Sequence, residues 1–554
     1  MAVNYPKRYL KAIREGKVLV PETVRTVYER LDGEMGLKVC KWKFDAALGQ
    51  HAIDFIETFC RHYEGELAGQ RVKLDLWQKA FVQTLFGWID RKTKVRRFNE
   101  FMLQIARKNG KSMLSACIMV YMLVADGEAG AQCVSIATKY DQAAIVYKAA
   151  RKIIEQDPDL DALVRPVIGG MEFKLTNSIM QALCSKSKTL DGLNLHYCSC
   201  DELHAIEDRN IYDVTKQAMG ARVQPIYGSI TTAGFNREGI YDSMYEYAYN
   251  VAMGIVIDDR FFAILYQLDA REEWTDPAMW IKANPGLGTI KRLEKIVEGV
   301  ERAKKDPSYL PTLLVKDFNI QETASTAWLP WSVLKNEEAV PIEKLQHSYA
   351  IGGCDLSATT DLTCATLVIK KPDDPHFYVL QQYFLPKARV DQIQKQGRKE
   401  APYKRWAELG WLTICETATV DYNAVTEWFV RMVTEHDIRP LWVCYDAALS
   451  GYWAPQMTET GFDMERIRQG PVTWTYPMKR MKGLFEDGLI VYQNNPILRW
   501  CLANTVAKSS NQKGIDSIQP EKASSNRRID GMVSLLNAMV GYYNHEEEFL
   551  QYVR

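Results

Sequence analysis

Residues 101–124 have the sequence FMLQIARKNGKSMLSACIMVYMLV. An apolar run is followed by a short polar loop with one glycine, and then by a long apolar stretch that favours a helix. This order of strand, loop and helix collects backbone N–H groups and the positive end of a helix at one point, where they favour anionic phosphate oxygens. The segment therefore predicts a phosphate-binding loop (P-loop) within an α/β domain.

The side chains of this loop indicate its chemistry. Lys111 can reach the β- and γ-phosphates of ATP, and the Ser112 hydroxyl can ligate Mg²⁺. The usual pattern G-x-x-x-x-G-K-[ST] has glycine where this chain has Ile105, so the match departs at its first position, and a chance Gly-Lys-Ser is the alternative. The residues expected to contact the nucleotide are Ala106, Arg107, Lys108, Asn109, Gly110, Lys111 and Ser112.

An acidic pair, Asp201 and Glu202, follows the run Leu195 to Cys200, about 90 residues after the loop. We expect Asp201 to hold the Mg²⁺ of the nucleotide, and Glu202 to orient and deprotonate the attacking water. Alone, such a pair is an ordinary helix cap. Together with the P-loop, it predicts ATP hydrolysis.

Two weaker features fit the same site. Trp77 and Gln78 lie upstream of the P-loop strand, where a ring and an amide can pack on adenine and hydrogen-bond it; Trp77 as a core residue is the alternative. Thr231 and Thr232 follow another apolar run and are expected to sense the γ-phosphate, with a simple polar turn as the alternative.

Further apolar runs alternate with helical stretches after residue 101, which predicts a mainly parallel sheet flanked by helices. These runs are Cys133 to Ala137, Ile179 to Cys184, Ile226 to Thr231 and Phe261 to Leu268. The fold class expected for this part is an α/β P-loop NTPase domain.

The C-terminal part has a different order of elements. Three consecutive strands, an antiparallel meander, are expected first, and alternating helices and strands follow them. This is the order of an RNase H-like α/β domain. The expected elements are strands Tyr349 to Cys354, Leu362 to Ile369, Phe377 to Phe384 and Leu441 to Tyr445, and helices Ala424 to Glu435 and Arg528 to about Tyr543.

Three aspartates lie at ends of these elements: Asp355 and Asp446 close strands, and Asp530 starts the last helix. An RNase H-like sheet brings such ends together, and a carboxylate cluster needs cations. Two Mg²⁺ or Mn²⁺ about 4 Å apart are the usual solution for phosphodiester hydrolysis. The three residues are therefore predicted as metal ligands of a DNA nuclease.

Three nearby residues are ranked lower. Asp361 begins a strand and Asp421 resembles a helix cap, so both are weaker ligand candidates. Lys522 is either a contact to the scissile phosphate or a solvated lysine.

Composition limits the remaining choices. The 69 basic and 69 acidic residues cancel, so DNA has to be bound by local patches such as Arg91 to Arg97, for which a solvated loop is the alternative. The 12 scattered cysteines indicate reduced thiols in a cytosol. The longest apolar run, Ala116 to Ala125, is too short to cross a membrane. Expected divisions are an N-terminal helical appendage at 1–65, the ATPase domain at 66–325, a linker at 326–345 and the nuclease domain at 346–554.

These motifs, with Leu190-Asp191-Gly192-Leu193 and Thr231-Thr232-Ala233-Gly234, resemble the large subunits of tailed-phage terminases of the HK97-like kind over about residues 65 to 545. A P-loop without its first glycine is typical of that family. The resemblance implies cutting of concatemeric double-stranded DNA and its translocation into a procapsid. It also implies a portal protein and a terminase small subunit as partners. The protein would form a ring of five copies when it packages DNA and would be a monomer in solution. No membrane is involved, and the implied location is the cytoplasm of the bacterial host cell.

The family also needs an arginine finger, which the sequence does not assign; the candidates are Arg107, Arg151, Arg222, Lys186 and Lys188. Two other functions remain open at this point. A DExH-type helicase requires a second ATPase-like domain, whereas the C-terminal part offers three aspartates. A nucleotide-sensing assembly adaptor binds ATP without turnover, and Glu202 beside Asp201 argues against it.

Overall fold

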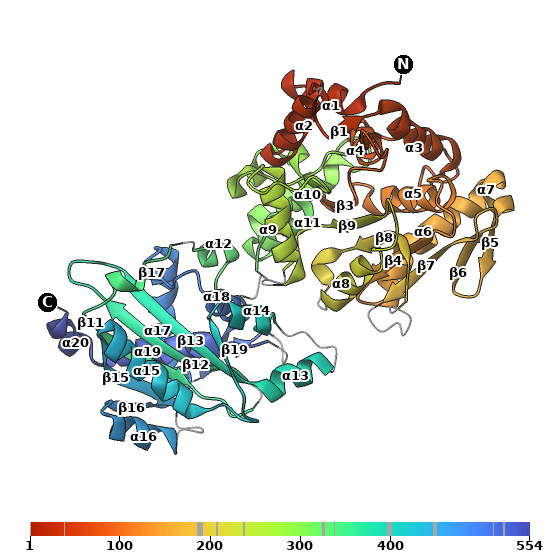
Figure 1. The fold of residues 1–554 in the computed structure, drawn as a ribbon. Helices are drawn as coiled ribbons and strands as arrows, with labels where there is room; N and C mark the ends of the chain where they lie inside the picture. The colour runs from red at the N-terminus through yellow and green to blue at the C-terminus, as the bar shows by residue number, and fades with distance from the viewer. Residues whose placement is uncertain are drawn as a thin grey trace. The chain divides into compact units, whose positions relative to one another are not determined.

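The protein is described by a computed structural model in which the chain divides into two compact units, Met1–Gln321 and Glu322–Arg554. Each unit has its own sheet and hydrophobic core (Figure 1). The described residues are 2–37, 39–184, 192–206, 209–235, 239–323, 327–336, 338–359, 361–395, 401–446, 451–512, 515–523 and 527–553.

The first unit is built on an eight-stranded sheet with the order β10-β3-β9-β8-β4-β7-β6-β5. The strands from β10 to β7 are parallel, whereas β6 and β5 add to one edge in antiparallel fashion. The predicted mainly parallel sheet is therefore confirmed (Figure 1). The strands are β3 (Glu100–Gln104), β4 (Gln132–Ala137), β5 (Val164–Val167), β6 (Gly170–Phe173), β7 (Ser178–Cys184), β8 (Leu195–Asp201), β9 (Ile226–Thr231) and β10 (Phe261–Leu265).

The N-terminal helices pack into the same core as this sheet. Tyr9 and Ile53, from the segment expected as an appendage, are buried with the strand residues, and the Tyr9 and Tyr266 hydroxyls lie 3.1 Å apart. The predicted domain limits at residues 65, 325 and 345 stay predictions. The helices are α1 (Tyr5–Arg14), α2 (Glu22–Met35), α3 (Ala46–Phe59), α4 (Leu76–Gly87), α5 (Lys111–Val124), α6 (Tyr140–Gln156), α7 (Pro158–Leu163), α8 (Arg209–Gln217) and α9 (Ile240–Ala252), with a small sheet of β1 (Trp42–Phe44) and β2 (Trp88–Asp90).

Residues 266–319, here called the cap, follow the edge strand β10. They contain η3 (Trp280–Lys282), α10 (Leu293–Lys305) and α11 (Leu310–Asp317). The cap has a small core of its own, and one member of that core, Ala106, comes from the P-loop. The cap and the P-loop are thus packed together.

The second unit contains a sheet with the order β14-β13-β12-β11-β15-β16, and β17 pairs with β13. β11, β12 and β13 form the predicted antiparallel meander, and β15 and β16 continue parallel to β11. This is the RNase H-like order. The strands are β11 (Ser348–Asp355), β12 (Thr363–Lys370), β13 (Phe377–Pro386), β14 (Leu412–Cys415), β15 (Ile438–Asp446), β16 (Met464–Ile467) and β17 (Ile490–Val491).

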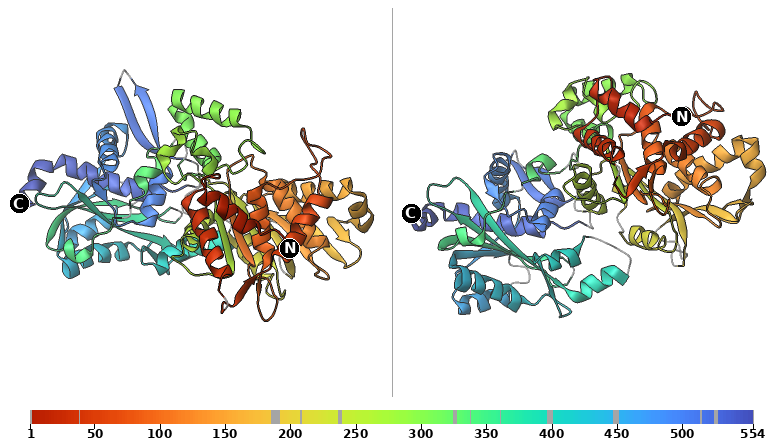
Figure 2. Two further views of the ribbon diagram at one scale, coloured as in Figure 1. Left: turned by 90° about the horizontal axis from the view of Figure 1, so that it is seen from above. Right: turned by 45° about the horizontal axis from the view of Figure 1, so that its top comes forward.

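Helix α19 (Asp530–Asn544) lies against β11, β12 and β15, and a hairpin of β18 (Thr505–Gln512) and β19 (Ile515–Lys522) projects from this unit (Figure 2). Part of the segment expected as a linker, including Trp328 and Leu334, is buried in the core of the unit. The other helices are α12 (Trp331–Leu334), α13 (Lys387–Lys395), α14 (Tyr403–Glu408), α15 (Tyr422–His436), α16 (Trp453–Thr460), α17 (Pro471–Glu486), α18 (Pro496–Ala503) and α20 (Glu546–Tyr552).

The basic run 91–97, expected as a DNA-binding patch, is in part a structural element. Arg96 is 5% exposed and pairs with Asp126, whereas Arg97 is 3% exposed and pairs with Glu34 and Asp259. Because their charges are neutralised inside the unit, these two arginines are not available to DNA phosphates. The patch hypothesis is wrong for them.

The contact between α19 and β11 predicts a stability effect. A Cβ atom added at Gly353 would lie 2.3 Å from the backbone oxygen of Ser534. We expect Gly353→Ala to destabilise the second unit by about 1–3 kcal/mol, because the helix must move away. Calorimetric unfolding of the full chain measures this. Gly483→Ala, in α17 with no atom within 4 Å of the new Cβ, is the control and should stabilise slightly; equal melting of both variants would contradict the packing argument.

Candidate functional sites

The P-loop connects β3 to α5 as the sequence predicts. Gly110 is the residue before α5 and has φ of +79°, a conformation that glycine adopts without strain. Lys111, the first helical residue, is 7% exposed. Arg107 and Lys108 are exposed, whereas Asn109 is fully buried. Ser112, one residue into the helix, is partly buried.

The acidic pair lies next to this lysine. Asp201 ends β8, and Glu202 follows it with φ of +51°. Lys111 Nζ lies 3.5 Å from Glu202 Oε1. Two motifs that are 91 residues apart in sequence therefore meet in one ion pair.

Burial and charge set the ionisation of these groups. Burial lowers the pKa of Lys111, opposed by the charges of Glu202 and Asp201. Burial and the charge of Glu202 raise the pKa of Asp201 to about 6, against the effect of Lys111. Burial opposes ionisation of Glu202, but the nearby His204 and Lys111 outweigh it and lower the pKa of Glu202 to about 2. Glu202 is therefore ionised at neutral pH.

His204 is a contact that the sequence analysis did not assign. Its Nδ1 atom lies 3.0 Å from Glu202 Oε2 and 3.1 Å from Thr231 Oγ1. A Cβ atom at Gly234 would lie 2.7 Å from His204 Cβ, so the glycine allows this imidazole to pack closely. His204 thus joins the acidic pair to the Thr231–Gly234 segment; its position in Asp-Glu-Leu-His was the available sequence signal.

Trp77 and Gln78 lie at the start of α4. Trp77 is 3% exposed and packs edge-on against Tyr266, with ring centroids 5.6 Å apart. Gln78 Oε1 accepts a hydrogen bond from the Asp75 N–H at 2.9 Å, and a Cβ atom at Gly110 would lie 3.8 Å from Gln78 Nε2. Gln78 is therefore beside the P-loop, whereas Trp77 is part of the core.

The arginine finger remains unassigned. Arg222 donates to Glu128 and to the Gly130 carbonyl at 2.7 and 2.6 Å, before β4, and so lies away from the P-loop edge of the sheet. Arg151 is exposed and pairs with Glu155 at 2.6 Å. Lys186, Lys188 and the first two residues of Leu190-Asp191-Gly192-Leu193 lie outside the described residues.

In the second unit, the three predicted aspartates lie near one another. Asp355 and Asp446 end the parallel neighbours β11 and β15, and Asp530 is the first residue of α19. The pKa of Asp355 is raised well above its usual value, first by burial and then by the charges of Asp530, Asp446 and Asp361. The topology thus brings together carboxylates from three separate elements.

Asp361 belongs to the same cluster, although the sequence ranked it lower. Its oxygens accept from Lys522 Nζ at 2.9 Å and Arg528 at 2.7 Å. Lys522 is therefore an ion-pair partner rather than a solvated lysine. Burial and the charge of Asp361 raise the pKa of Asp530 to about 6, which Lys522 and Arg528 oppose. Asp421, in contrast, caps α15 through the Asn423 N–H at 3.0 Å, as expected.

Carboxylate oxygens are the donors that Mg²⁺ and Mn²⁺ prefer. Asp530 is 6% exposed, and its Oδ2 atom has no hydrogen-bond partner among the described residues. This oxygen therefore has lone pairs with which it can ligate a cation. In the described part of the chain, no three acidic, histidine or cysteine side chains are close enough to enclose a metal ion as they stand. The donor chemistry fits the predicted ion.

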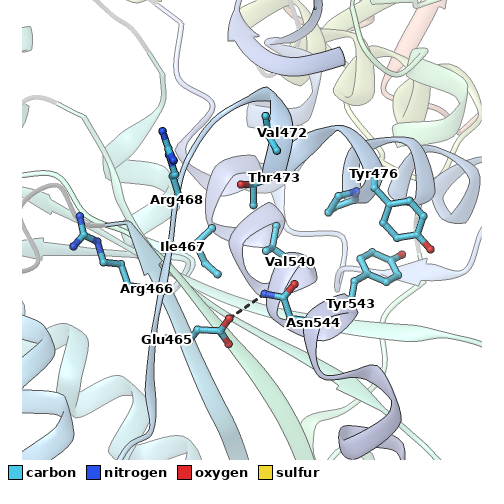
Figure 3. A pocket seen from close by; sticks show the side chains of 11 residues that line it. Glu465, Arg466, Ile467, Arg468, Val472, Thr473, Tyr476, Val540, Tyr543 and Asn544 are labelled. Carbon is cyan, nitrogen blue, oxygen red and sulfur yellow. Dashed lines mark hydrogen bonds between the residues drawn. The ribbon is translucent and has the colours of Figure 1, made fainter. Parts of the chain in front are cut away.

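A cavity of about 500 Å³ lies between β16, α17 and α19 (Figure 3). Its wall includes Ile467, the register neighbour of Asp446, and the ring of Tyr476. At its lower end Asn544 donates to Glu465 at 3.0 Å. The cavity lies beside β16, the strand next to the one that Asp446 ends, and none of the predicted site residues lines it.

Two family models match the chain. "Terminase large subunit, ATPase domain" matches residues 76–250, and "Terminase large subunit, endonuclease domain" matches residues 255–546. The chain is 27% identical over 507 residues to the "Terminase, large subunit" of Enterobacteria phage HK97, which covers 90% of this chain and 96% of that protein. It is 29% identical over 372 residues to "Protein YmfN" of Escherichia coli (strain K12), with coverage of 65% and 80%.

Among solved structures, the "Crystal structure of the HK97 bacteriophage large terminase" is similar with a TM-score of 0.48 and 25% identity, covering 89% of this chain and 99% of that chain.

The two units define a two-domain enzyme, an ATPase followed by a nuclease. The endonuclease model alone matches more than half of the residues, and the chain belongs to the terminase large subunit family. It is therefore a phage DNA-packaging protein with ATPase and endonuclease activity that uses a nucleotide and divalent metal. The helicase alternative is wrong, because the second unit has the RNase H-like order instead of a second ATPase-like sheet. A nucleotide-sensing adaptor that binds ATP without hydrolysing it is also excluded, because the matched family consists of ATPases.

The raised pKa of Asp201 predicts a pH dependence. Below about pH 6 this carboxyl is protonated and, as the predicted Mg²⁺ ligand, would lose the charge that attracts the ion, whereas Glu202 stays ionised. We expect affinity for Mg²⁺-ATP to fall about tenfold per pH unit below that value. Titration of a fluorescent ATP analogue between pH 5 and 8 measures this. Asp201→Asn should bind weakly with no such inflection, and an inflection that persists in this variant would assign the effect to another group.

Proposed function

We propose that ATP binds to Ala106–Ser112 with its Mg²⁺ held by Ser112 and Asp201. Lys111 contacts the β- and γ-phosphates, and Glu202 orients and deprotonates the attacking water. The observation that carries this proposal is the 3.5 Å approach of Lys111 Nζ to Glu202 Oε1. A γ-phosphate that enters between them attracts the lysine and leaves the carboxylate facing the water.

The surrounding residues are proposed to complete this site. Thr231 and Thr232 sense the γ-phosphate, because Thr231 contacts His204, and His204 contacts Glu202. Gln78 and Trp77 are proposed at the adenine. The position of Gln78 beside Gly110 supports a hydrogen bond from its amide to the base. Because Trp77 is buried, it is proposed only to pack behind the Gln78 amide.

We further propose that Asp355, Asp446 and Asp530 bind two Mg²⁺ or Mn²⁺ ions. When bound, these cations activate water and stabilise the leaving oxygen of the phosphodiester. The protein positions the three carboxylates near one another from β11, β15 and α19, and it shields Asp530 from water. Lys522 and Arg528 pair with Asp361, which places positive charge where a DNA phosphate would approach.

The remaining proposals concern the assembly. The substrate is double-stranded DNA, cut from concatemers and moved into a procapsid. The partners are the portal protein and the terminase small subunit. The motor is a ring of five copies, which assembles from monomers. The host cytoplasm is the proposed location; among the described residues no helix is long and apolar enough for a membrane.

Substitutions in the first unit test the ATPase site. Lys111→Ala or Glu202→Gln should lower ATP turnover by more than about a hundredfold, because each removes a group that acts on the γ-phosphate or the water. Phosphate release by the full-length protein measures turnover, and Glu298→Gln, on the exposed face of α10, is the control. Metal-dependent plasmid nicking should persist in both variants. Complete loss of nicking would show that the two activities are obligately coupled.

The nuclease assignment is tested by Asn substitutions at Asp355, Asp446 and Asp530. Each removes a charged ligand with little change in volume, so folding should survive while plasmid nicking with Mn²⁺ falls by more than about a hundredfold. Mn²⁺ should also raise the melting temperature of the parent more than that of the variants. Asp421→Asn, which keeps an Asn cap on α15, is the matched control. Normal nicking by Asp446→Asn with loss in Asp421→Asn would overturn the ligand set.

A further inference from the structure

The Asn109 side chain, expected from the sequence to contact the nucleotide, is instead bonded to its own loop and to the cap, so that prediction is wrong for the side chain. It is fully buried, and its Nδ2 atom donates to the carbonyls of Ala106 and Arg107 at 3.1 and 3.2 Å. The same Nδ2 donates to Asn284 Oδ1 at 2.9 Å, and Asn109 Oδ1 accepts from the Gly286 N–H at 3.1 Å. One amide thus closes the loop on itself and attaches it to the cap.

Asn284, on the cap, has no free hydrogen-bonding capacity. Its Oδ1 accepts from Asn109 and from Lys291 Nζ, both at 2.9 Å. Its Nδ2 donates to the carbonyls of Trp280 and Asp317, at 3.0 and 2.8 Å. An asparagine amide has two donors and two acceptor positions. All four are used, so the orientation of the group is fixed.

A buried ion pair holds this amide from behind. Lys291 is 5% exposed, and its Nζ atom lies 2.7 Å from Asp317 Oδ1. Burial lowers the pKa of Lys291, and Asp317 opposes that effect. A buried ammonium is costly unless its hydrogen bonds are satisfied. Asn284 and Asp317 accept two of its three N–H groups, so Lys291 depends on Asn284 for a hydrogen-bond partner.

The backbone gives a second attachment. The Ala106 N–H donates to the Ala283 carbonyl at 3.3 Å, and the Arg107 N–H donates to the Lys316 carbonyl at 3.0 Å. The methyl group of Ala106 is part of the cap's apolar core. Ala106 and Arg107, at the start of the P-loop, are therefore bonded to the cap and packed against it. The rest of the loop continues from these two residues to Lys111.

The cap also contacts the other side of the nucleotide site. Asn319 Oδ1 accepts from the Ala233 N–H at 3.1 Å, and Asn319 Nδ2 donates to the Tyr266 carbonyl at 2.7 Å. Ala233 belongs to the segment that packs on His204. The P-loop and the Thr231–Gly234 segment are thus both bonded to residues of the cap.

We propose that Asn284 is a positioning residue for ATP binding: it acts through Asn109 to hold residues 108–112 in the conformation that receives the phosphates. The proposal rests on the ATP site proposed above. Without Asn284, the Asn109 amide and Lys291 each lose a buried partner, and the loop can leave its binding conformation. A population of unbound loop conformers lowers apparent affinity and leaves the chemistry of the bound state intact.

The test is equilibrium binding of a fluorescent ATP analogue with Mg²⁺, and steady-state ATP hydrolysis, by full-length Asn284→Ala. We expect Kd and KM to rise about tenfold, since a buried hydrogen bond is lost, with kcat within about twofold of the parent. Asn109→Ala should give the same effect. The double variant Asn109→Ala/Asn284→Ala should raise Kd by less than the two single effects combined, because each single variant already removes the bond between the two side chains.

Ile296→Val is the matched control: Ile296 is fully buried in the cap core and should lower the melting temperature without changing Kd. If Asn284→Ala does not fold, Asn109→Ala decides, since it leaves Asn284, Lys291 and Asp317 bonded to one another. An unchanged Kd in a folded variant, or additive effects in the double variant, would overturn the proposal. Affinity for the ATP analogue is measured in parallel for Lys111→Ala. Unchanged affinity in Lys111→Ala would overturn the proposed ATP site itself. Weaker binding by Lys111→Ala together with parental binding by Asn284→Ala would overturn only the role of Asn284.

Discussion

The parallel register of β3, β9 and β8 is the constraint on which the ATPase site depends. Gln104 is paired with Thr231, and Ile230 with Asp201, so the P-loop, the two threonines and the acidic pair all leave the sheet at one edge. In the second unit, β11 and β15 bring Asp355 and Asp446 to the same kind of edge. A slip of one residue would turn each of these side chains to the opposite face. Both proposed sites therefore depend on the strands pairing in one register.

The two sites differ in how they tolerate buried charge. In the first, the Lys111 ammonium lies 3.5 Å from Glu202 and offsets part of the charge of the acidic pair before the nucleotide arrives. In the second, the partly buried Asp355 lies near the buried Asp530, and the nearby cations, Lys522 and Arg528, are paired with Asp361. Like charges in a dry site raise one another's pKa. We therefore expect bound divalent cations to stabilise the nuclease unit more than the ATPase unit.

Much of this was predictable from the sequence, because apolar runs and the residues that follow them are local features. Strands β3, β4, β7, β8, β9 and β10, the meander and the positions of Asp355, Asp446 and Asp530 follow from such patterns, whereas strands β5, β6, β14 and β16, at or next to the sheet edges, were not predicted. Long-range pairing does not follow from them either. Lys522 meets Asp361 across 161 residues, and Asn109 meets Asn284 across 175, and no spacing rule predicts either contact. Arg96 and Arg97 belong to an ordinary basic run, and only the fold supplies the acidic partners that bury them.

The missing glycine of the P-loop has a physical explanation in these contacts. Ile105 is fully buried, and its N–H donates to the Thr231 carbonyl at 3.0 Å, which extends the pairing of β3 with β9 by one residue. A residue in that position points its side chain into the core and gives its N–H to the sheet, so it needs neither positive φ nor close approach to phosphate. Gly110 is different, because its φ of +79° is required at the turn into α5. The loop keeps glycine at the turn into α5, accepts a φ of +64° at Lys108, and does not need glycine at position 105, where the sheet holds the chain.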